Sequence, residues 1–280
     1  MENKTIVITG ASDGIGKAAA KELKSLGNNV IIVGRSKEKT ESVAKELDCP
    51  YYLVDYADLD QVVKLANELR KLDRIDVLAN NAGGVQNERQ ITKDGFEKTF
   101  QINHLGSFLL TYLLLDKLCE CNATVIQTSS IAANMFSAFD IDDLNNEKDY
   151  TPFKAYGNGK LENVLFTREL DRRYKSKGIN AVAFEPGVVR TNFGAGSIKF
   201  VEFAYHSFLK YFFTISPEKS AKRLIWLSIA KPDKDFKTGS TYTKKKIMDI
   251  KFKDQDGKVA EELWNKSLKM IEKYIKNDTL

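Results

Sequence analysis

Short runs of β-branched and apolar residues alternate with longer stretches in which apolar positions recur every three or four residues. The first pattern is typical of buried strands and the second of amphipathic helices. The short runs predict strands near residues 5–9, 29–33, 51–54, 75–80, 123–128, 179–184 and 240–243. The longer stretches predict helices near residues 14–26, 37–47, 58–72, 93–119, 154–177, 217–229 and 258–276.

This alternation of strand and helix predicts an α/β fold. We expect a single-domain, Rossmann-type, doubly wound parallel sheet of about seven strands with helices on both faces. The chain has 280 residues, of which 42% are hydrophobic, and this is enough for one large core. Residues 1–280 are therefore predicted to form one dinucleotide-binding and catalytic domain.

A glycine-rich turn joins the first predicted strand to the first predicted helix. Its glycines are Gly10, Gly14 and Gly16. In such a turn glycines allow close approach of the backbone to a dinucleotide, and the helix N-terminus faces the pyrophosphate. A plain strand-to-helix turn is the alternative. The second strand follows at the distance expected of a βαβ unit, which favours nucleotide binding.

Tyr156 and Lys160 stand four residues apart at the start of the helix predicted near 154–177. Four residues make about one helical turn, so both side chains lie on one face. The unperturbed pKa of tyrosine is ~10, and a nearby ammonium group lowers it by favouring the phenolate. Such a pair can move a proton to or from a substrate oxygen. A surface pair without chemistry is the alternative interpretation.

Six motifs follow one another in order between residue 5 and about residue 195 and resemble the short-chain dehydrogenase/reductase family. They are Thr9-Gly10-x-x-x-Gly14-Ile15-Gly16, Asn80-Asn81-Ala82-Gly83, the helix asparagine Asn103, Ser129-Ser130, Tyr156-x-x-x-Lys160, and Pro186-Gly187-Val188-Val189-Arg190-Thr191. The resemblance implies an enzyme that transfers a hydride between a nicotinamide cofactor and a carbonyl or alcohol.

A narrower resemblance concerns the segment between the serine and the tyrosine. Ser130 and Tyr156 are 26 residues apart, farther than in most of the family. This insertion, and the sequence that follows Lys160, resemble the retinol-dehydrogenase-like branch, which acts on lipophilic alcohols and carbonyls. Gly159 departs from the family, which often has serine there. With Gly157 it predicts a permissive helix start and looser packing around Tyr156.

By this resemblance four residues are expected to be catalytic. Tyr156 is the general acid and base. Lys160 lowers the pKa of Tyr156 and binds the nicotinamide ribose. Ser130 orients the substrate oxygen, and Asn103 holds a water that relays protons to Lys160. The alternatives are a serine bonded to backbone and a structural polar residue in a helix. Ser129 competes with Ser130 for its role, and the family pattern favours Ser130.

The same resemblance predicts the cofactor site. Arg35 and Ser36 replace the acidic residue that would bind the ribose of NAD, so we expect NADP, with NAD as the alternative. Asp13 either weakens phosphate binding or caps the following helix. The expected cofactor-binding residues are Gly10, Ser12, Asp13, Gly14, Ile15, Gly16, Arg35, Ser36, Asp55, Asn81, Ala82, Gly83, Tyr156, Lys160, Pro186, Gly187, Val189 and Thr191.

Residues 195–230 are expected to cover the substrate. Within them, seven of the fourteen residues of 200–213 are aromatic. At helical spacing the apolar positions share a broad arc, opposite a polar side that contains Lys210. Three interpretations stay open: a lid over a lipophilic substrate, a helix in peripheral contact with a membrane, and a core or subunit-contact helix.

Composition excludes several other classes of protein. The net charge of +5 is small and dispersed, and the cluster Lys244–Lys246 is typical of a solvated loop, so no nucleic-acid partner is expected. The three cysteines form no C-x-x-C pair and indicate reduced thiols in a cytoplasmic protein. Two distant histidines exclude a His-rich zinc site, and no metal is expected.

No apolar run approaches the length of a membrane span, and the chain begins almost directly with its first strand, so no N-terminal anchor is expected. Helices near 93–119 and 154–177 resemble those through which relatives dimerise, so we expect a homodimer or homotetramer. The C-terminal stretch packs on the core or on a partner. A non-catalytic dinucleotide sensor or scaffold on the same fold is the alternative to an enzyme.

Overall fold

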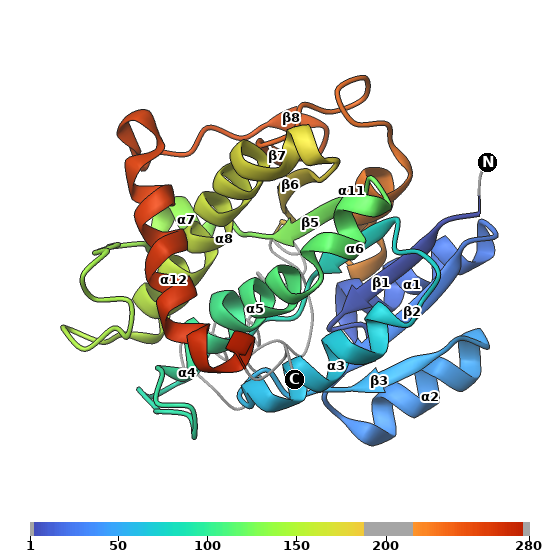
Figure 1. Ribbon diagram of the computed structural model, residues 1–280, viewed down its shortest axis with the longest axis horizontal. Coiled ribbons are helices and arrows are strands. Elements are labelled where there is room, and N and C mark those ends of the chain that lie inside the picture. The colour runs from blue at the N-terminus through green and yellow to red at the C-terminus, as the bar shows by residue number, and fades with distance from the viewer. Residues whose placement is uncertain (1–2, 188–214, 277–280) are drawn as a thin grey trace.

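The computed structural model of the protein describes residues 3–187 and 215–276. Its centre is a single sheet of eight strands in the order β3-β2-β1-β4-β5-β6-β7-β8 (Figure 1). Among the strands that the structure describes, only β7 and β8 pair antiparallel. The strands are β1 (Thr5–Thr9), β2 (Asn29–Gly34), β3 (Tyr51–Leu53), β4 (Val77–Asn80), β5 (Thr124–Thr128), β6 (Asn180–Glu185), β7 (Thr241–Thr243) and β8 (Lys246–Ile247).

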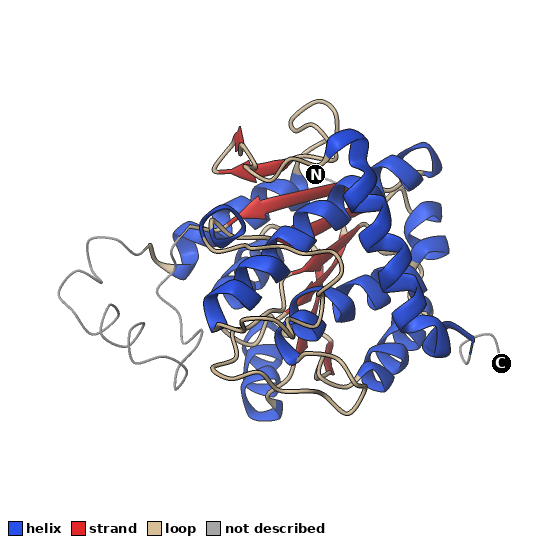
Figure 2. Cartoon of the chain, turned by 90° about the vertical axis from the view of Figure 1, so that its left-hand side faces the viewer, coloured by secondary structure: helices blue, strands red, loops and turns tan. Residues whose placement is uncertain are grey.

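Helices cover both faces of this sheet (Figure 2). They are α1 (Gly14–Ser25), α2 (Lys37–Leu47), α3 (Leu59–Arg70), α4 (Lys98–Phe100), α5 (Gly106–Leu113), α6 (Leu115–Glu120), α7 (Ala132–Met135), α8 (Pro152–Tyr174), α11 (Pro217–Ile229) and α12 (Lys258–Lys276). A π-helical turn spans Gln101–Leu105, and 3-10 turns span Lys175–Lys177 and Gln255–Gly257.

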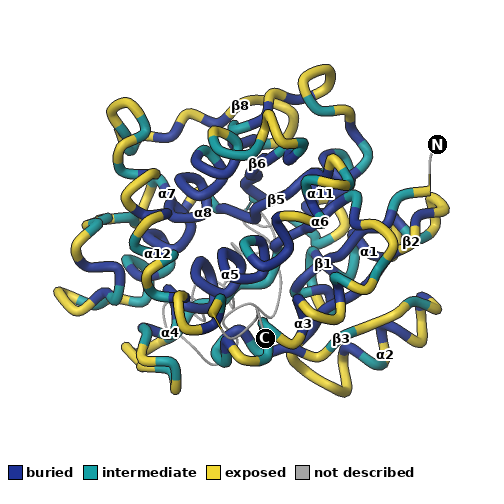
Figure 3. Tube along the Cα trace, viewed as in Figure 1, coloured by how far each residue is buried: buried dark blue, intermediate teal, exposed yellow. Residues whose placement is uncertain are grey.

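Alternating side chains of the strands fill two cores. Along β1, Val7 joins the core under α3, α5 and α8, whereas Ile6 and Ile8 join the core under α1, α2 and α11. Successive side chains of a strand point to opposite faces, so a fully apolar run needs helices on both sides. The tube in Figure 3 shows the sheet buried and the exposed positions gathered on the outer sides of the helices and in the loops.

The doubly wound α/β fold is confirmed, with two corrections. The sheet has eight strands where about seven were expected, because the chain turns back at Lys244 and Lys245 and adds β8 at the edge. The single helix expected near 93–119 is wrong. Gly95, with a φ of 90°, lies in a turn closed by a hydrogen bond from Thr92 N to Phe96 O, and the helix begins only at Lys98.

The C-terminal helix α12 packs on the core. Its Trp264 ring lies 5.0 Å from the ring of Phe108 on α5 and 5.8 Å from that of Phe166 on α8. The guanidinium of Arg173 lies over the same indole, 5.0 Å from its centre. The parts of α5 and α8 beneath α12 are therefore covered by the chain itself, and a second subunit would have to use other surfaces. No described helix has the length and apolar character needed to cross a bilayer.

We expect Trp264→Ala to lower the free energy of unfolding by about 3–5 kcal/mol, because it removes a buried ring that joins three helices. Urea unfolding followed by circular dichroism measures this change. Lys269→Ala, at an exposed position of the same helix, is the control and should alter stability by less than about 0.5 kcal/mol. A loss below about 1 kcal/mol for Trp264→Ala would show that α12 is not held by this contact.

Candidate active site

The glycine loop after β1 lies directly against the loop after β4. Gly10 has a φ of 66°, and a Cβ atom there would stand 2.9 Å from the Cα atom of Ala82. A Cβ atom on Gly16 would stand 2.4 Å from the carbonyl oxygen of Gly10. These glycines are thus required by contact between backbones. The loops meet between β1 and β4, where the strand order reverses and α/β sheets bind their ligands.

Asn81 ties three strand ends together at this place. Its Nδ2 atom donates to the carbonyl oxygens of Thr9, at 3.0 Å, and Gly10, at 3.3 Å. Its Oδ1 atom accepts from the hydroxyl of Thr128, at 3.3 Å. The side chain of Asn81, one of the expected cofactor-binding residues, therefore bonds β1 and β5 to the end of β4.

Lys160 is buried at the carboxyl end of β5. Its Nζ atom donates to the carbonyl oxygen of Thr128, at 3.1 Å, and lies 5.4 Å from the centre of the Tyr156 ring. Burial lowers the pKa of Lys160 to about 8, because the charged form loses solvation. The spacing of four residues thus places both side chains on one face, as expected, with Tyr156 only partly buried.

Asn103 reaches the same place from the π-helical turn. Its Nδ2 atom donates to the carbonyl oxygens of Gly84, at 2.7 Å, and Thr99, at 2.8 Å, and its Oδ1 atom accepts from Gly84 N at 3.2 Å. A Cβ atom on Gly83 would stand 2.7 Å from Asn103 Oδ1 and 3.0 Å from Lys160 Nζ. Because Gly83 has no side chain, the amide and the ammonium group can both approach its backbone closely.

The two candidate serines differ in their surroundings. Ser129 is buried, and its hydroxyl donates to the carbonyl oxygen of Lys160 at 2.8 Å. Ser130 is only partly buried, and its Oγ atom accepts from Ala132 N at 3.2 Å. Ser129 thus fixes the backbone of α8, whereas Ser130 presents its hydroxyl at the less buried end of the loop after β5.

The looser packing expected from Gly157 and Gly159 is wrong. A Cβ atom on Gly157 would stand 2.7 Å from backbone atoms of Phe136 and Ser137. One on Gly159 would stand 3.0 Å from the Cβ atom of Asn103. Neighbouring segments fill the space that the two glycines leave, so the start of α8 is tightly packed on both sides of Asn158.

Arg35, on which the expectation of NADP rests, directly follows the last residue of the second strand. Arg35 is exposed and makes no side-chain hydrogen bond or ion pair within residues 3–187 and 215–276. Ser36 caps α2, with its Oγ atom accepting from Lys39 N at 3.5 Å. The side chain of Asp13 caps α1 by accepting a hydrogen bond from Gly14 N at 2.8 Å, which is one of the two roles expected from the sequence. Asp55 accepts from Ala57 N at 2.9 Å.

The turn at the end of β6 is held by side chains that the motifs do not include. The carboxylate of Glu185 accepts from Gly187 N and from the hydroxyl of Thr243, the latter at 2.9 Å. Arg223 on α11 donates to the carbonyl oxygen of Pro186. In the sequence, Glu185 could have been found as the charged residue directly before the Pro186-Gly187 pair. Val189, Thr191 and the segment 200–213 lie outside the described residues.

The residues described so far fit a dinucleotide along the carboxyl ends of β1, β2, β4, β5 and β6. Gly10 and Gly83 let neighbouring segments approach closely, because a Cβ atom at either position would stand within 3.0 Å of Ala82 or Asn103, and exposed Arg35 stands at one end of the row. The expected site residues within the described ranges thus come together at one edge of the sheet.

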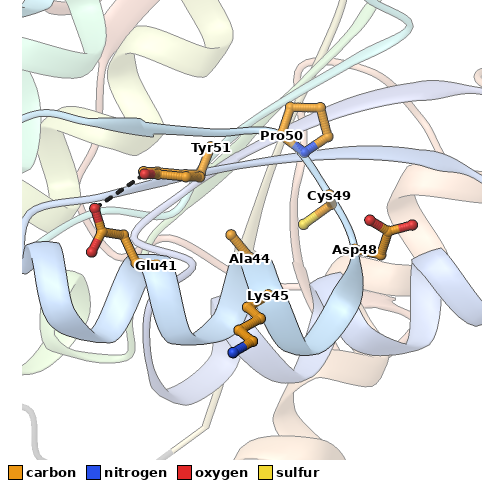
Figure 4. Close-up of a pocket in the computed structure, with 7 residues that line it drawn as sticks. All are labelled: Glu41, Ala44, Lys45, Asp48, Cys49, Pro50 and Tyr51. Carbon is orange, nitrogen blue, oxygen red and sulfur yellow. Dashed lines mark hydrogen bonds between the residues drawn. The ribbon is translucent and has the colours of Figure 1, made fainter.

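Two other features of the structure lie away from the carboxyl ends of these strands. The hollow in Figure 4, between the end of α2 and the start of β3, lies at the amino end of β3 and contains none of the expected site residues. The carboxylates of Asp58, Asp60 and Asp94 gather near one another, but Lys93 Nζ pairs with Asp58 at 2.6 Å and with Asp60 at 3.1 Å. Lys93 therefore supplies the positive charge of this cluster.

Known proteins are similar to this chain in sequence and fold. The short chain dehydrogenase profile matches residues 4–200. Retinol dehydrogenase 13 of Homo sapiens is 36% identical over 96% of this chain and 84% of its own. DnrU of Streptomyces sp. (strain C5), provisionally named a daunorubicin C-13 ketoreductase, is 36% identical over 95% of this chain and 92% of its own.

Among solved structures, an uncharacterized protein of Mycobacterium paratuberculosis has a TM-score of 0.73 and 28% identity, covering 96% of this chain and 93% of its own. A structure from Shigella flexneri 2a, described as a short chain dehydrogenase complexed with NADP, has a TM-score of 0.67 and 22% identity, covering 86% of this chain and 96% of its own. At this identity the similarity shows only that the two chains share a fold. With the profile match, the fold and the site in agreement, this chain belongs to the short-chain dehydrogenase/reductase family, in its retinol-dehydrogenase-like branch.

Proposed function

We propose that this protein is an NADP-preferring oxidoreductase that transfers a hydride between the cofactor and a lipophilic carbonyl or alcohol. The observation that carries the proposal is the buried ammonium group of Lys160 beside the Tyr156 ring, next to Asn103 and Gly83. The alternative interpretation, a surface pair without chemistry, would leave the lysine exposed, whereas Lys160 is buried. The NADP-bound Shigella flexneri structure of the same fold supports this choice of cofactor.

The residues at the site support one proton path. A nicotinamide bound along the strand ends supplies or accepts the hydride. In reduction Tyr156 donates its hydroxyl proton to the substrate oxygen, and in oxidation its phenolate takes that proton back. The positive charge of Lys160 stabilises the phenolate, and Ser130 holds the substrate oxygen by a hydrogen bond. Asn103, fixed by three hydrogen bonds, supports a water-mediated route from Lys160.

An exposed apolar patch beside these groups supports a lipophilic substrate. It consists of Ile131, Met135, Phe136 and Phe153, and the first three are 37%, 61% and 40% exposed. The rings of Phe136 and Phe153 lie 5.1 Å apart. Ile131 directly follows Ser130, and Phe153 stands one helical turn before Tyr156. An apolar molecule whose oxygen reaches Tyr156 would therefore cover this patch and remove it from water.

We expect Tyr156→Phe to lower kcat by about 10²–10⁴-fold, because it removes the proton donor and keeps the ring. Cofactor binding should persist. Oxidation of NADPH with a panel of aldehydes and ketones measures turnover, and dihydronicotinamide fluorescence measures binding. Tyr51→Phe, at the amino end of the sheet, is the control with unchanged rate. An unchanged rate in Tyr156→Phe would exclude this mechanism.

The reductive kcat/KM for NADPH is expected to fall as pH rises through about 8, the pKa of Lys160 in the protein without cofactor. Above this pH the amine is neutral and no longer stabilises the phenolate that Tyr156 leaves after it donates its proton. Initial rates between about pH 6 and pH 10 test this. A level profile over that range would contradict a charged Lys160 as the required form.

We expect Met135→Lys to raise the KM of a long-chain aldehyde about tenfold, equivalent to about 1.4 kcal/mol, and to leave the KM of a short one unchanged. The added charge prevents an apolar chain from covering the patch. Leu26→Lys, an apolar position that is 40% exposed at the end of α1, is the control. Equal effects on long and short aldehydes would show that the patch does not bind the substrate chain.

A further inference from the structure

The π-helical turn that carries Asn103 is held by side chains on both sides of that residue. All five residues of the turn, Gln101–Leu105, are buried, and a hydrogen bond from Gly106 N to the carbonyl oxygen of Gln101 closes it. Such turns are rare in proteins and are frequent at functional sites. Gln101 stands two positions before Asn103 and His104 directly after it, and both side chains bond to other parts of the chain.

His104 is held by the C-terminal helix α12. Its Nε2 atom lies 2.9 Å from the hydroxyl oxygen of Ser267, and both residues are fully buried. Burial lowers the pKa of His104 to about 3, so the ring is neutral. Among the described residues the bond to Ser267 is the only hydrogen bond of this ring, because Nδ1 has no partner there. Its other neighbours are aromatic rings, with centres 5.6 to 6.0 Å away, of Phe100, Phe108 and Phe166.

Gln101 is held by the same helix through a carboxylate. Its Nε2 atom donates to Asp94 Oδ2 at 2.8 Å, and Tyr274 of α12 donates its hydroxyl to the other oxygen of Asp94 at 2.7 Å. Burial, together with the hydrogen bond to Asp94, raises the pKa of Tyr274 above its usual range, so the hydroxyl stays protonated. Leu59 N, at the start of α3, also donates to Asp94, at 3.0 Å. Asp94 therefore joins the π-helical turn to α3 and α12.

The two contacts lie on one face of α12. Ser267 and Tyr274 are seven residues apart, which is about two helical turns, and both are buried. Ile271, between them on the same face, is fully buried as well. In Figure 1 the helix runs across α8 and past α5, and it also contacts α3. One face of α12 thus reaches the π-helical turn at two points, one on each side of Asn103.

We propose that α12 positions Asn103 for the proton route by holding the π-helical turn on both sides of it. Ser267 holds the turn through His104, and Tyr274 holds it through Asp94. These four are positioning residues, since each acts through the turn that carries Asn103. The inference rests on the proposed function, in which this asparagine supports a water-mediated route for the proton.

The orientation of the Asn103 amide depends on where the turn lies relative to the sheet. Its Nδ2 atom bonds the carbonyl oxygen of Thr99, within the same helical segment, and that of Gly84, in the loop after β4. A shift of the turn would keep the first bond and lengthen the second. Since a misplacement of about 1 Å costs up to about 10²-fold in rate, the loss of one of two supports should cost less, about three- to tenfold.

The test uses Ser267→Ala and Tyr274→Phe in the full chain, each of which removes one hydroxyl group. Steady-state rates with NADPH and the best aldehyde of the panel give kcat and KM, in H₂O and in D₂O. Each variant should lower kcat by about three- to tenfold and leave both KM values unchanged. The solvent isotope effect on kcat should rise, because proton movement then limits turnover more. In the double variant the loss should exceed the product of the single losses, because each support partly replaces the other.

Ser228→Ala is the matched control. Ser228 is fully buried on α11, and its hydroxyl donates to the carbonyl oxygen of Leu224 in the same helix, at 2.8 Å. This variant also removes one buried serine hydroxyl, but far from the π-helical turn in the chain. It should lower the midpoint of thermal unfolding about as much as Ser267→Ala and leave kcat and the solvent isotope effect unchanged.

The outcomes separate this inference from the proposed function. If the unmodified protein neither binds NADPH nor turns over, both are wrong. If it turns over, but Ser267→Ala and Tyr274→Phe keep its kcat and isotope effect, only the role of α12 is wrong. A raised KM at unchanged kcat, or an equal loss of kcat in Ser228→Ala, would also overturn the inference. The two variants break bonds on opposite sides of Asn103, so either one decides the question if the other does not fold.

Discussion

The arrangement of the site depends on an ammonium group buried at the end of the sheet. Removing the charge of Lys160 from water is costly unless polar groups replace the lost solvation. Thr128 supplies a carbonyl oxygen at 3.1 Å, and this requires α8 to lie close against the end of β5. Ser129 reinforces the same contact from the strand side by bonding the carbonyl oxygen of Lys160. Glycines at positions 83 and 159 leave the space in which Asn103 approaches.

The opposite side of α8 is also polar and buried, and it holds the insertion before Tyr156. Asn158 donates to Asn146 Oδ1 at 2.9 Å, and Asn146 donates to Glu97 Oε2 at 3.3 Å. Glu162 lies one turn after Asn158, and burial, with the nearby charge of Glu97, raises the pKa of its carboxyl well above its usual range. The insertion is thus fastened by a hydrogen-bonded network, and α7 at its start is held against Gly157. Tyr156 therefore lies between the insertion, which this network fixes, and the part of α8 that Lys160 fixes against β5.

The two ends of the proposed cofactor site are built differently. At the β2 end the charged groups are exposed, and their mutual pairing changes easily with solvent or ligand. At the β6 end Glu185 is buried and bonded to the turn that follows the strand, with Thr243 of β7 as its second partner. Hydride transfer is proposed at the β6 end, where the support is rigid. The adenosine is proposed at the β2 end, where the charged groups can change partners. This difference agrees with a reaction that demands accurate geometry only at the reacting carbon.

The sequence by itself determined the alternation of strands and helices, the doubly wound fold and the motifs that gather at one edge, because period and glycine spacing are local properties. It also placed Tyr156 and Lys160 on one helix face. Only the tertiary structure decided the break before Lys98, the π-helical turn at Asn103, the packing of α12 over α5 and α8, and the distinction between the surroundings of Ser129 and Ser130. The packing of α12 and the hydrogen bond from Ser129 to Lys160 join residues far apart in the chain, and so does the bond from Glu97 N, just before the break, to Asn145 Oδ1. Gly159 shows the reason most directly: local propensity predicts a loose helix start, whereas the side chain of Asn103, 56 positions earlier, fills the space beside it.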